Sequence, residues 1–349
     1  MSNKIFLGLL VFVPVTIVAE YLHVSSVIIF FLAALAIIPL ARFIGEATEV
    51  LSIYTGSAWG GFLNATFGNA TEILIGIFAL KAGLIEVVKA SITGSIIGNL
   101  LLVLGMAMFF GGWRYKKQVF NKTAVLASAS TLLLAVTALV MPAVFTLTAP
   151  SIGKSIVDEL SVFVAIFMLI VYFANLFFML FTHKHLYTEE VGEFEAKWSK
   201  VKSLAILVIT TVAVAWMSEI LVGSIEPIVA RFGWTELFIG VIFVAIIGNA
   251  AEHSSAIIMA VKNRMDLSLQ ISIGSGTQIA MFVAPFLVLV SLLFREHMSL
   301  VFNTFELIAI TLAVLIANFV VEDGESNWLE GLQLMAAYAI MAVAFFFHP

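Results

Sequence analysis

The stretch GNATE, Gly68 to Glu72, recurs 180 residues later as GNAAE, Gly248 to Glu252. At the same offset Gly94-Ser95 falls on Gly274-Ser275 without a gap. Each copy of the motif places a glutamate, an amide side chain and a glycine inside an apolar run. A charged group at the depth of a bilayer is costly, so an ionisable residue there indicates a functional site. Two related copies favour an internally duplicated transporter whose site lies where the halves meet.

The composition is that of a polytopic membrane protein. Of the 349 residues, 62% are hydrophobic and 11% are charged, and the mean hydropathy is +1.12. A soluble domain has about a quarter of its residues charged. The chain has no cysteine, which excludes disulfides, thiol chemistry and cysteine-bound metals. It also lacks a basic tract, so nucleic acid is not an expected partner. The apolar composition makes the lipid bilayer an expected partner.

The expected fold is all-α, with eleven transmembrane helices. A membrane-spanning helix needs about 20 apolar residues. Lys4 precedes an apolar run without a small-residue cleavage site, so this run is read as a retained first span. The predicted spans are 5–22, 25–51, 58–81, 86–110, 122–146, 156–181, 203–229, 235–261, 267–294, 300–320 and 327–347. The short links at 52–57 and 82–85 have the weakest polar signals.

The spans divide into four parts along the chain. Residues 1–24 form an N-terminal transmembrane helix, 25–181 a first five-helix repeat, 182–202 a cytoplasmic linker and 203–349 a second five-helix repeat. Five is an odd number, so the second repeat is inverted relative to the first. Both motif glutamates then fall near the centres of their spans, where inverted copies would meet at the bilayer midplane.

The placement of Lys and Arg predicts the orientation. With eleven spans, twelve of the 17 basic residues fall on the N-terminal side and five on the other. Cytoplasmic loops carry an excess of Lys and Arg. We therefore expect a multi-pass protein of the cell membrane with a cytoplasmic N-terminus and an external C-terminus.

The two motifs supply the ligands of a hard divalent cation. Such an ion needs oxygen ligands: carboxylates, amide and backbone carbonyls, and water. Asn69 and Glu72 are three residues apart, as are Asn249 and Glu252, so each pair shares one helix face. The two carboxylates match one divalent ion in charge. The absence of soft ligands favours calcium or manganese over copper.

The glycines and the glutamates add two further functions. Gly68 and Gly248 loosen the helix and expose backbone carbonyls, which a membrane tolerates only where they line a cavity or site. A poorly solvated carboxylate holds its proton more tightly. Glu72 and Glu252 can therefore bind either a proton or a cation, and this competition gives exchange of about two protons for one metal ion.

Other polar residues surround these motifs. The next spans carry residues that could complete the shell or hydrogen-bond the glutamates: Ser95, Asn99, Ser275, Thr277 and Gln278. Two acidic pairs, at the inner end of the second span and on the seventh span, could attract cations at the mouths: Glu46 and Glu49, and Glu219 and Glu226.

Structural interpretations compete with each of these assignments. A glutamate buried in a helix bundle can be protonated and hydrogen-bonded only. Asn, Gln and Ser between membrane helices are often packing contacts, worth about 0.6 kcal/mol on average. The acidic pairs near span ends can be interfacial charges.

Two long stretches carry a family resemblance. GNATEILIGIFALKAG (68–83) and GNAAEHSSAIIMAVKNRMDLSLQISIGSGTQIAMFVAPFLV (248–288) resemble the cation/proton exchanger (CAX) family of calcium/cation antiporters, and most of all the bacterial Ca2+/H+ antiporters. The resemblance runs from about residue 25 to the end. It implies eleven helices in a one-plus-five-plus-five layout and an exchange of calcium for protons. We expect no cofactor, and the lack of a His-Glu-x-x-His pair or a paired-aspartate lipid-phosphate motif argues against an intramembrane enzyme. The resemblance also assigns essential acidic residues to Glu72 and Glu252, and amide ligands or hydrogen-bond partners to Asn69, Asn249, Asn99 and Gln278.

The sequence also departs from that pattern and leaves alternatives open. In GSIIGNLLLV, Gly98 stands where a Ser is expected before Asn99. The chain lacks the Gly-Thr-Ser-x-Pro-Glu type of motif found in sodium/calcium exchangers, which places sodium or potassium coupling second, together with Mn2+/H+ exchange. A cation channel is less favoured, because a symmetric pore usually comes from subunit symmetry. A homo-oligomer is left open.

Overall fold

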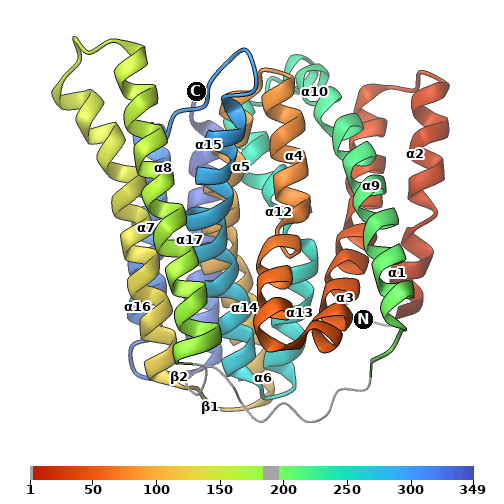
Figure 1. Cartoon of the computed structure of the whole chain (residues 1–349), viewed down its shortest axis with the longest axis vertical. Helices are drawn as coiled ribbons and strands as arrows, with labels where there is room; N and C mark the ends of the chain where they lie inside the picture. The colour runs from red at the N-terminus through yellow and green to blue at the C-terminus, as the bar shows by residue number, and fades with distance from the viewer. Residues whose placement is uncertain (1–2, 184–195) are drawn as a thin grey trace. The chain divides into compact units, whose positions relative to one another are not determined.

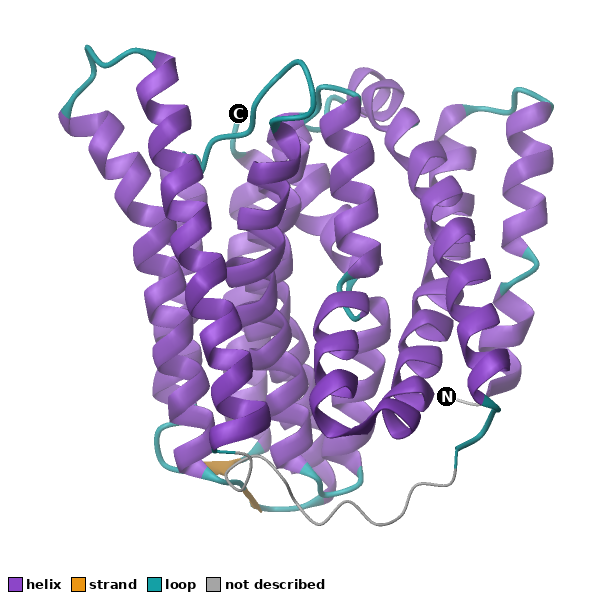
Figure 2. Ribbon diagram, viewed as in Figure 1, coloured by secondary structure: helices purple, strands orange, loops and turns teal. Residues whose placement is uncertain are grey.

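The computed structural model describes residues 3–183 and 196–349, and almost all of them are helical (Figures 1 and 2). The α-helices are α1 (Asn3–Leu9), α2 (Phe12–Tyr21), α3 (Ser26–Phe67), α4 (Ala70–Lys81), α5 (Ile85–Ile97), α6 (Leu104–Arg114), α7 (Lys122–Thr148), α8 (Lys154–Phe177), α9 (Lys200–Gly223), α10 (Ile225–Phe232), α11 (Glu236–Phe238), α12 (Ala245–Gly248), α13 (Ala250–Val261), α14 (Met265–Gln278), α15 (Ala284–Ser291), α16 (Thr304–Val320) and α17 (Trp328–Phe347). Four π-helical segments are η1 (Gly98–Val103), η2 (Phe178–Thr182), η4 (Ile239–Val244) and η5 (Ile279–Val283). The strands are β1 (Gln118–Val119) and β2 (Glu325–Ser326).

Contacts between residues divide the chain into two units. Unit 1 comprises residues 1–84, 174–236 and 247–251, and unit 2 comprises residues 85–173, 237–246 and 252–349. The division does not follow the two predicted repeats, because each unit takes helices from both halves of the sequence.

The described helices include seven that are long and apolar enough to cross a membrane, or eight if one bent pair counts as a span. Eleven spans were expected. Two of the other expected spans are shorter apolar helices, Ile5–Tyr21 and Thr304–Val320. The remaining one, expected over 58–81, is divided between the end of α3 and the separate helix α4. The polytopic helical class is confirmed, whereas the number eleven stays a prediction.

Unit 1 is built around the 42-residue helix α3, which packs against α9 and α2. The expected link at 52–57 is wrong, because α3 continues through it. The sequence there, SIYTGS, contains no proline, and its single glycine does not end the helix. In the N-terminal half of α3, Arg42 forms an ion pair with Glu46 at 3.0 Å. The guanidinium of Arg42 also lies 4.0 Å from the centre of the Phe6 ring on α1.

Both copies of the glycine motif lie at helix breaks. Gly68 and Asn69 separate α3 from α4, and Asn249 separates α12 from α13. At the second break the helix Glu236–Gly248 and the helix Ala250–Val261 are bent by 60°. The loosening that the sequence predicts at the two glycines is therefore present in both copies.

The helix bounds recur at the offset of the sequence motifs. Helix α4 covers 70–81 and α13 covers 250–261, which is a shift of 180 residues. Likewise α5 begins at Ile85 and α14 at Met265, and each leads without a gap into a π-helical segment, η1 or η5. Local structure is therefore duplicated along with the motifs.

Glycines allow the helices of unit 2 to pack closely. A Cβ on Gly94 of α5 would lie 2.0 Å from the carbonyl oxygen of Val241 in η4. A Cβ on Gly331 of α17 would lie 2.3 Å from the backbone nitrogen of Phe109 in α6. Both sites place two helix backbones in direct contact, the packing mode typical of membrane helices with small residues at their interface.

A small two-stranded sheet was not expected in an all-α fold. Strands β1 and β2 pair antiparallel in unit 2, with Gln118 opposite Ser326 and Val119 opposite Glu325. Two loops at one end of the unit run extended here, and pairing satisfies their backbone groups. The side chain of Gln118 also donates to the carbonyl of Ala260 (2.9 Å) at the end of α13.

The predicted linker at 182–202 lies mostly outside the described residues, which omit 184–195. Its first residue, Thr182, ends η2, and its last three residues already belong to α9. In α9 the N-cap is Ser199, whose hydroxyl accepts the backbone N–H of Lys202 at 3.4 Å.

Candidate functional site

Glu72 of the first motif lies against Gly248 of the second. A Cβ built on Gly248 would lie 3.2 Å from Cγ of Glu72 and 3.5 Å from its Cδ and Oε1. Both residues belong to unit 1. The structure therefore brings a carboxylate of one sequence half to the glycine of the other. That glycine allows the carboxylate to approach the backbone at the second helix break, since no side chain intervenes.

The two break residues are amides, and both are buried. Asn69 is 3% exposed and Asn249 is 1% exposed. Asn69 is the N-cap of α4, but its side chain makes no capping hydrogen bond to that helix. Gly68, just before it, closes the last turn of α3 through its N–H to the carbonyl of Asn64 at 2.8 Å.

Both glutamates occupy the first turn of a helix. Glu72 lies in the first turn of α4, and Glu252 lies in the first turn of α13. The N-terminus of a helix carries partial positive charge, which favours a carboxylate there. For α13 the break lies between the two halves of a bent apolar pair, Glu236–Gly248 and Ala250–Val261, so this charge is presented between two apolar helices.

Unit 2 holds the second group of predicted site residues. Asn99 is fully buried in η1, and its Cβ lies 3.9 Å from where a Cβ on Gly276 of α14 would stand. Ser95 is 3% exposed on α5, and Gln278 ends α14 just before η5. Asn99 and Gln278 therefore both lie within or next to a π-helical segment, a distortion found frequently at functional sites.

The predicted ligands separate into two groups. Unit 1 contains Gly68, Asn69, Glu72, Gly248 and Asn249, and unit 2 contains Ser95, Asn99, Glu252, Ser275 and Gln278. Among the described residues, no group of three or more His, Asp or Glu side chains could hold a metal ion. The two groups instead combine carboxylates with amide and hydroxyl side chains, and oxygen atoms of this kind are the ligands that hard cations prefer.

The acidic residues predicted at the mouths differ in their surroundings. Glu46 pairs with Arg42, and Glu219 pairs with Lys81 at 3.1 Å. Glu49 and Glu226 are exposed. Glu219 lies in α9 and Glu226 in the next helix, α10, and both helices belong to one candidate span, Lys200–Phe232.

Two polar residues in unit 2, Thr93 and Glu306, make a hydrogen bond that sequence reasoning missed. Thr93 of α5 donates to Glu306 of α16 at 2.8 Å, across 213 residues of sequence. The pattern Asn303-x-x-Glu306 before an apolar run is a capping-box signal that could have identified Glu306. The hydroxyl of Thr277 is used within its own helix, where it donates to the carbonyl of Ile273 at 2.8 Å.

Comparison with known proteins identifies the family of this chain. The sequence pattern of the sodium/calcium exchanger protein family matches residues 25–181 and 202–347, which is most of the chain. The chain belongs to the sodium/calcium exchanger protein family. Within that family it is 49% identical to a Ca2+/H+ antiporter of Aphanothece halophytica, over all of this chain and 98% of the relative. It is 47% identical to the Ca2+/H+ antiporter ChaA of Bacillus subtilis (strain 168), over 99% of both chains.

Solved structures of exchangers share the fold. The structure of native YfkE superposes with a TM-score of 0.87 at 44% identity, covering 98% of this chain and all of that one. A structure of the H+/Ca2+ exchanger CAX superposes with a TM-score of 0.75 at 13% identity, covering 99% of this chain and 92% of that one. At that identity the second likeness concerns the fold alone.

Proposed function

We propose that this chain is a secondary active transporter that exchanges Ca2+ for H+ across the membrane by alternating access. One observation carries the proposal: a carboxylate at one intramembrane helix break lies against the glycine of the second break. The activity is the one named for curated relatives that match nearly the whole chain at 47% and 49% identity.

The proposed ligands are the residues of the two motifs and the helices that follow them. Glu72 and Glu252 bind Ca2+ in one state and protons in the other. Oxygen atoms from the amides and the broken backbone complete the shell: Asn69, Asn249, Asn99, Gln278, Ser95, Ser275, Gly68 and Gly248. Ca2+ accepts six to eight oxygen ligands, so amides and carbonyls are required beside two carboxylates.

The proposed topology is eleven helices, one plus two inverted five-helix repeats, in the cell membrane. The offset of 180 residues between matching helices supports the duplication. The excess of Lys and Arg on one side supports a cytoplasmic N-terminus and an external C-terminus. With protons entering, Ca2+ leaves the cytoplasm. Glu49 and Glu226, both exposed, are the stronger candidates for attracting cations at the mouths.

Metal uptake into inside-out vesicles tests the function. An imposed pH gradient, acidic inside, should drive Ca2+ uptake in buffers free of sodium and potassium, and a proton ionophore should abolish it. A panel of competing cations ranks Mn2+ against Ca2+. Uptake that needs sodium or potassium would favour the second candidate, which the family name keeps open. Uptake that persists without any counter-ion would indicate a channel.

A further inference from the structure

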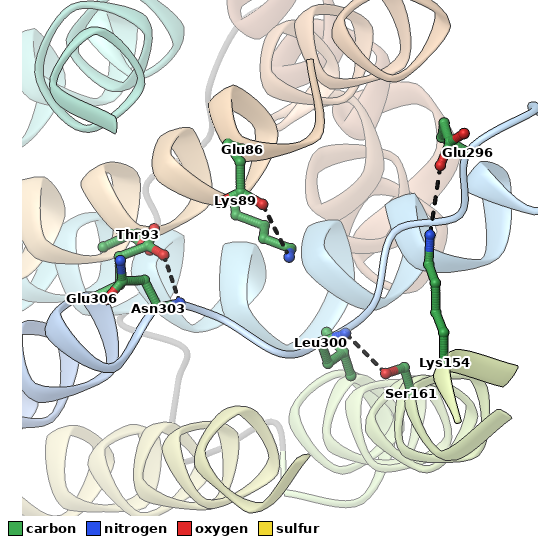
Figure 3. Close-up of polar contacts among 9 residues, drawn as sticks. All are labelled: Glu86, Lys89, Thr93, Lys154, Ser161, Glu296, Leu300, Asn303 and Glu306. Carbon is green, nitrogen blue, oxygen red and sulfur yellow. Dashed lines mark hydrogen bonds and ion pairs between the residues drawn. The ribbon is translucent and has the colours of Figure 1, made fainter. Parts of the chain in front are cut away.

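Glu306 is a buried carboxylate that the proposed exchange does not use. It is 1% exposed at the start of α16. Its Oε2 accepts the backbone N–H of Asn303 at 3.0 Å, and its Oε1 accepts the hydroxyl of Thr93 at 2.8 Å (Figure 3). The first bond belongs to the capping box of α16. The bond to Thr93 is not needed for capping, and it joins α16 to α5.

Helix α5 is also held by η4, through the residue next to Thr93. A Cβ on Gly94 would lie 2.0 Å from the carbonyl oxygen of Val241, and a Cβ on Gly240 would lie 2.4 Å from the Cβ of Ala90. These backbone contacts resist sliding of α5 along η4. A hydrogen bond to a buried carboxylate adds a directional restraint, which resists rotation of the helix about its axis.

The rotation of α5 decides where the predicted ligands point. Ser95 and Asn99 are four residues apart and share one face. Thr93 precedes Ser95 by two residues, so it points to the opposite side of the helix. A restraint on Thr93 therefore fixes the direction of Ser95 and, through η1, that of Asn99, which lies beside Gly276.

Charged neighbours of Glu306 lie on the same helix as Thr93. Lys89, one turn before Thr93, is 8% exposed and pairs with Glu86 at 3.4 Å (Figure 3). Glu86 itself is mostly exposed. Lys89 is therefore a buried positive charge that is already paired with Glu86. On α5, the group that hydrogen-bonds to Glu306 is the hydroxyl of Thr93.

We propose that Thr93 and Glu306 are positioning residues for cation binding, forming a latch that orients α5 and hence Ser95 and Asn99. This inference rests on the proposed function, since it assigns a role in the same site. The latch acts through hydrogen bonding, so the charge of Glu306 is not required. In Glu306→Gln the amide oxygen can accept from Asn303 while the amide nitrogen donates to Thr93.

The test compares paired variants in proteoliposomes that contain the purified full chain. Thr93→Val and Glu306→Ala remove the bond, whereas Thr93→Ser and Glu306→Gln retain it. Ser161→Ala is a matched control, because it removes a hydrogen bond that joins the segment before α16 to α8 instead of α5: Ser161 of α8 accepts the backbone N–H of Leu300 at 3.0 Å. The apparent KM for Ca2+, the maximal rate per folded transporter and the melting temperature are measured for each.

The latch predicts an apparent KM raised by about fivefold or more in Thr93→Val and Glu306→Ala, the size expected when a hydrogen bond worth about 1 kcal/mol is lost. Thr93→Ser and Glu306→Gln should stay within about twofold of the wild type, and Ser161→Ala should lower only the melting temperature. Unchanged KM in both bond-removing variants would overturn the latch, and so would equal damage by Glu306→Gln and Glu306→Ala. Wild-type protein that exchanges a different cation would instead refute the proposed function, and the comparison would then be made with that cation.

Discussion

At the scale of single residues, the proposed exchange depends on the two motif glutamates. Glu72→Gln and Glu252→Gln keep the shape of the side chain but remove its charge and its proton, so neither Ca2+ nor H+ has its ligand. Each substitution should reduce Ca2+/H+ exchange to the background of empty liposomes, with a melting temperature close to that of the wild type. Near-normal exchange by either well-folded variant would remove the central assignment.

A second residue-scale prediction concerns the contact between Glu72 and Gly248. In Gly248→Ala the added methyl group would meet Cγ of Glu72 at 3.2 Å. Overpacking of this kind costs about 1–3 kcal/mol. We expect this strain to displace Glu72 and to lower the apparent affinity for Ca2+ by about fivefold or more.

Gly45→Ala is the control for this experiment. Gly45 is also helical, but a Cβ there meets nothing within 4 Å. Ca2+ titrations of transport in both variants make the comparison. Equal affinities in Gly248→Ala and wild type would mean that Glu72 does not need its position against the second break.

At the scale of helices, the duplicated glycines differ in their packing. Gly94 and Gly274 occupy matching positions in the two halves, but a Cβ on Gly94 would clash with the backbone of Val241 and a Cβ on Gly274 meets nothing within 4 Å. Gly94→Ala should therefore lower the melting temperature and the yield of folded protein sharply. Gly274→Ala should leave both nearly unchanged or slightly improved, because alanine favours helix. Similar melting curves for the two variants would contradict the close α5–η4 contact.

Part of this helical arrangement could be predicted from the sequence. The glycine motifs predicted that the helices loosen there, and a helix break is present at both motifs. The link predicted at 52–57 was wrong, because α3 continues through that segment in spite of its glycine. The π-helical segments and the Thr93–Glu306 bond depend on packing between residues far apart in sequence, and a single sequence does not reveal such pairs.

The sequence could predict which chemical groups form the candidate site, but not which of these residues lie close together. The sequence indicated carboxylates and amides in two copies, and the structure adds that Glu72 lies against the second motif's glycine. Hydrophobic periodicity gave the helical class. It did not give the strands β1 and β2, because two-residue strands leave no periodic signal.

At the scale of the whole molecule, the proposed topology has its two ends on opposite sides of the membrane. The chain contains no cysteine, so single cysteines at Ser2 and at His348 can be probed with an impermeant thiol reagent. We expect labelling of the first only from the cytoplasmic side and of the second only from outside. Labelling of both from one side would mean an even number of spans, and the inverted-repeat proposal would fail.

The central claim is that the same carboxylates serve calcium and protons. Metal binding to protonated ligands releases protons, so metal affinity depends on pH. The most direct test is the apparent Ca2+ affinity of the purified transporter measured as a function of pH. We predict that affinity weakens as the pH falls, with a slope approaching about two protons per ion, and that Glu72→Asp shifts both the affinity and its pH dependence. An affinity that stays flat between about pH 6 and pH 8, while transport remains driven by protons, would contradict the shared site.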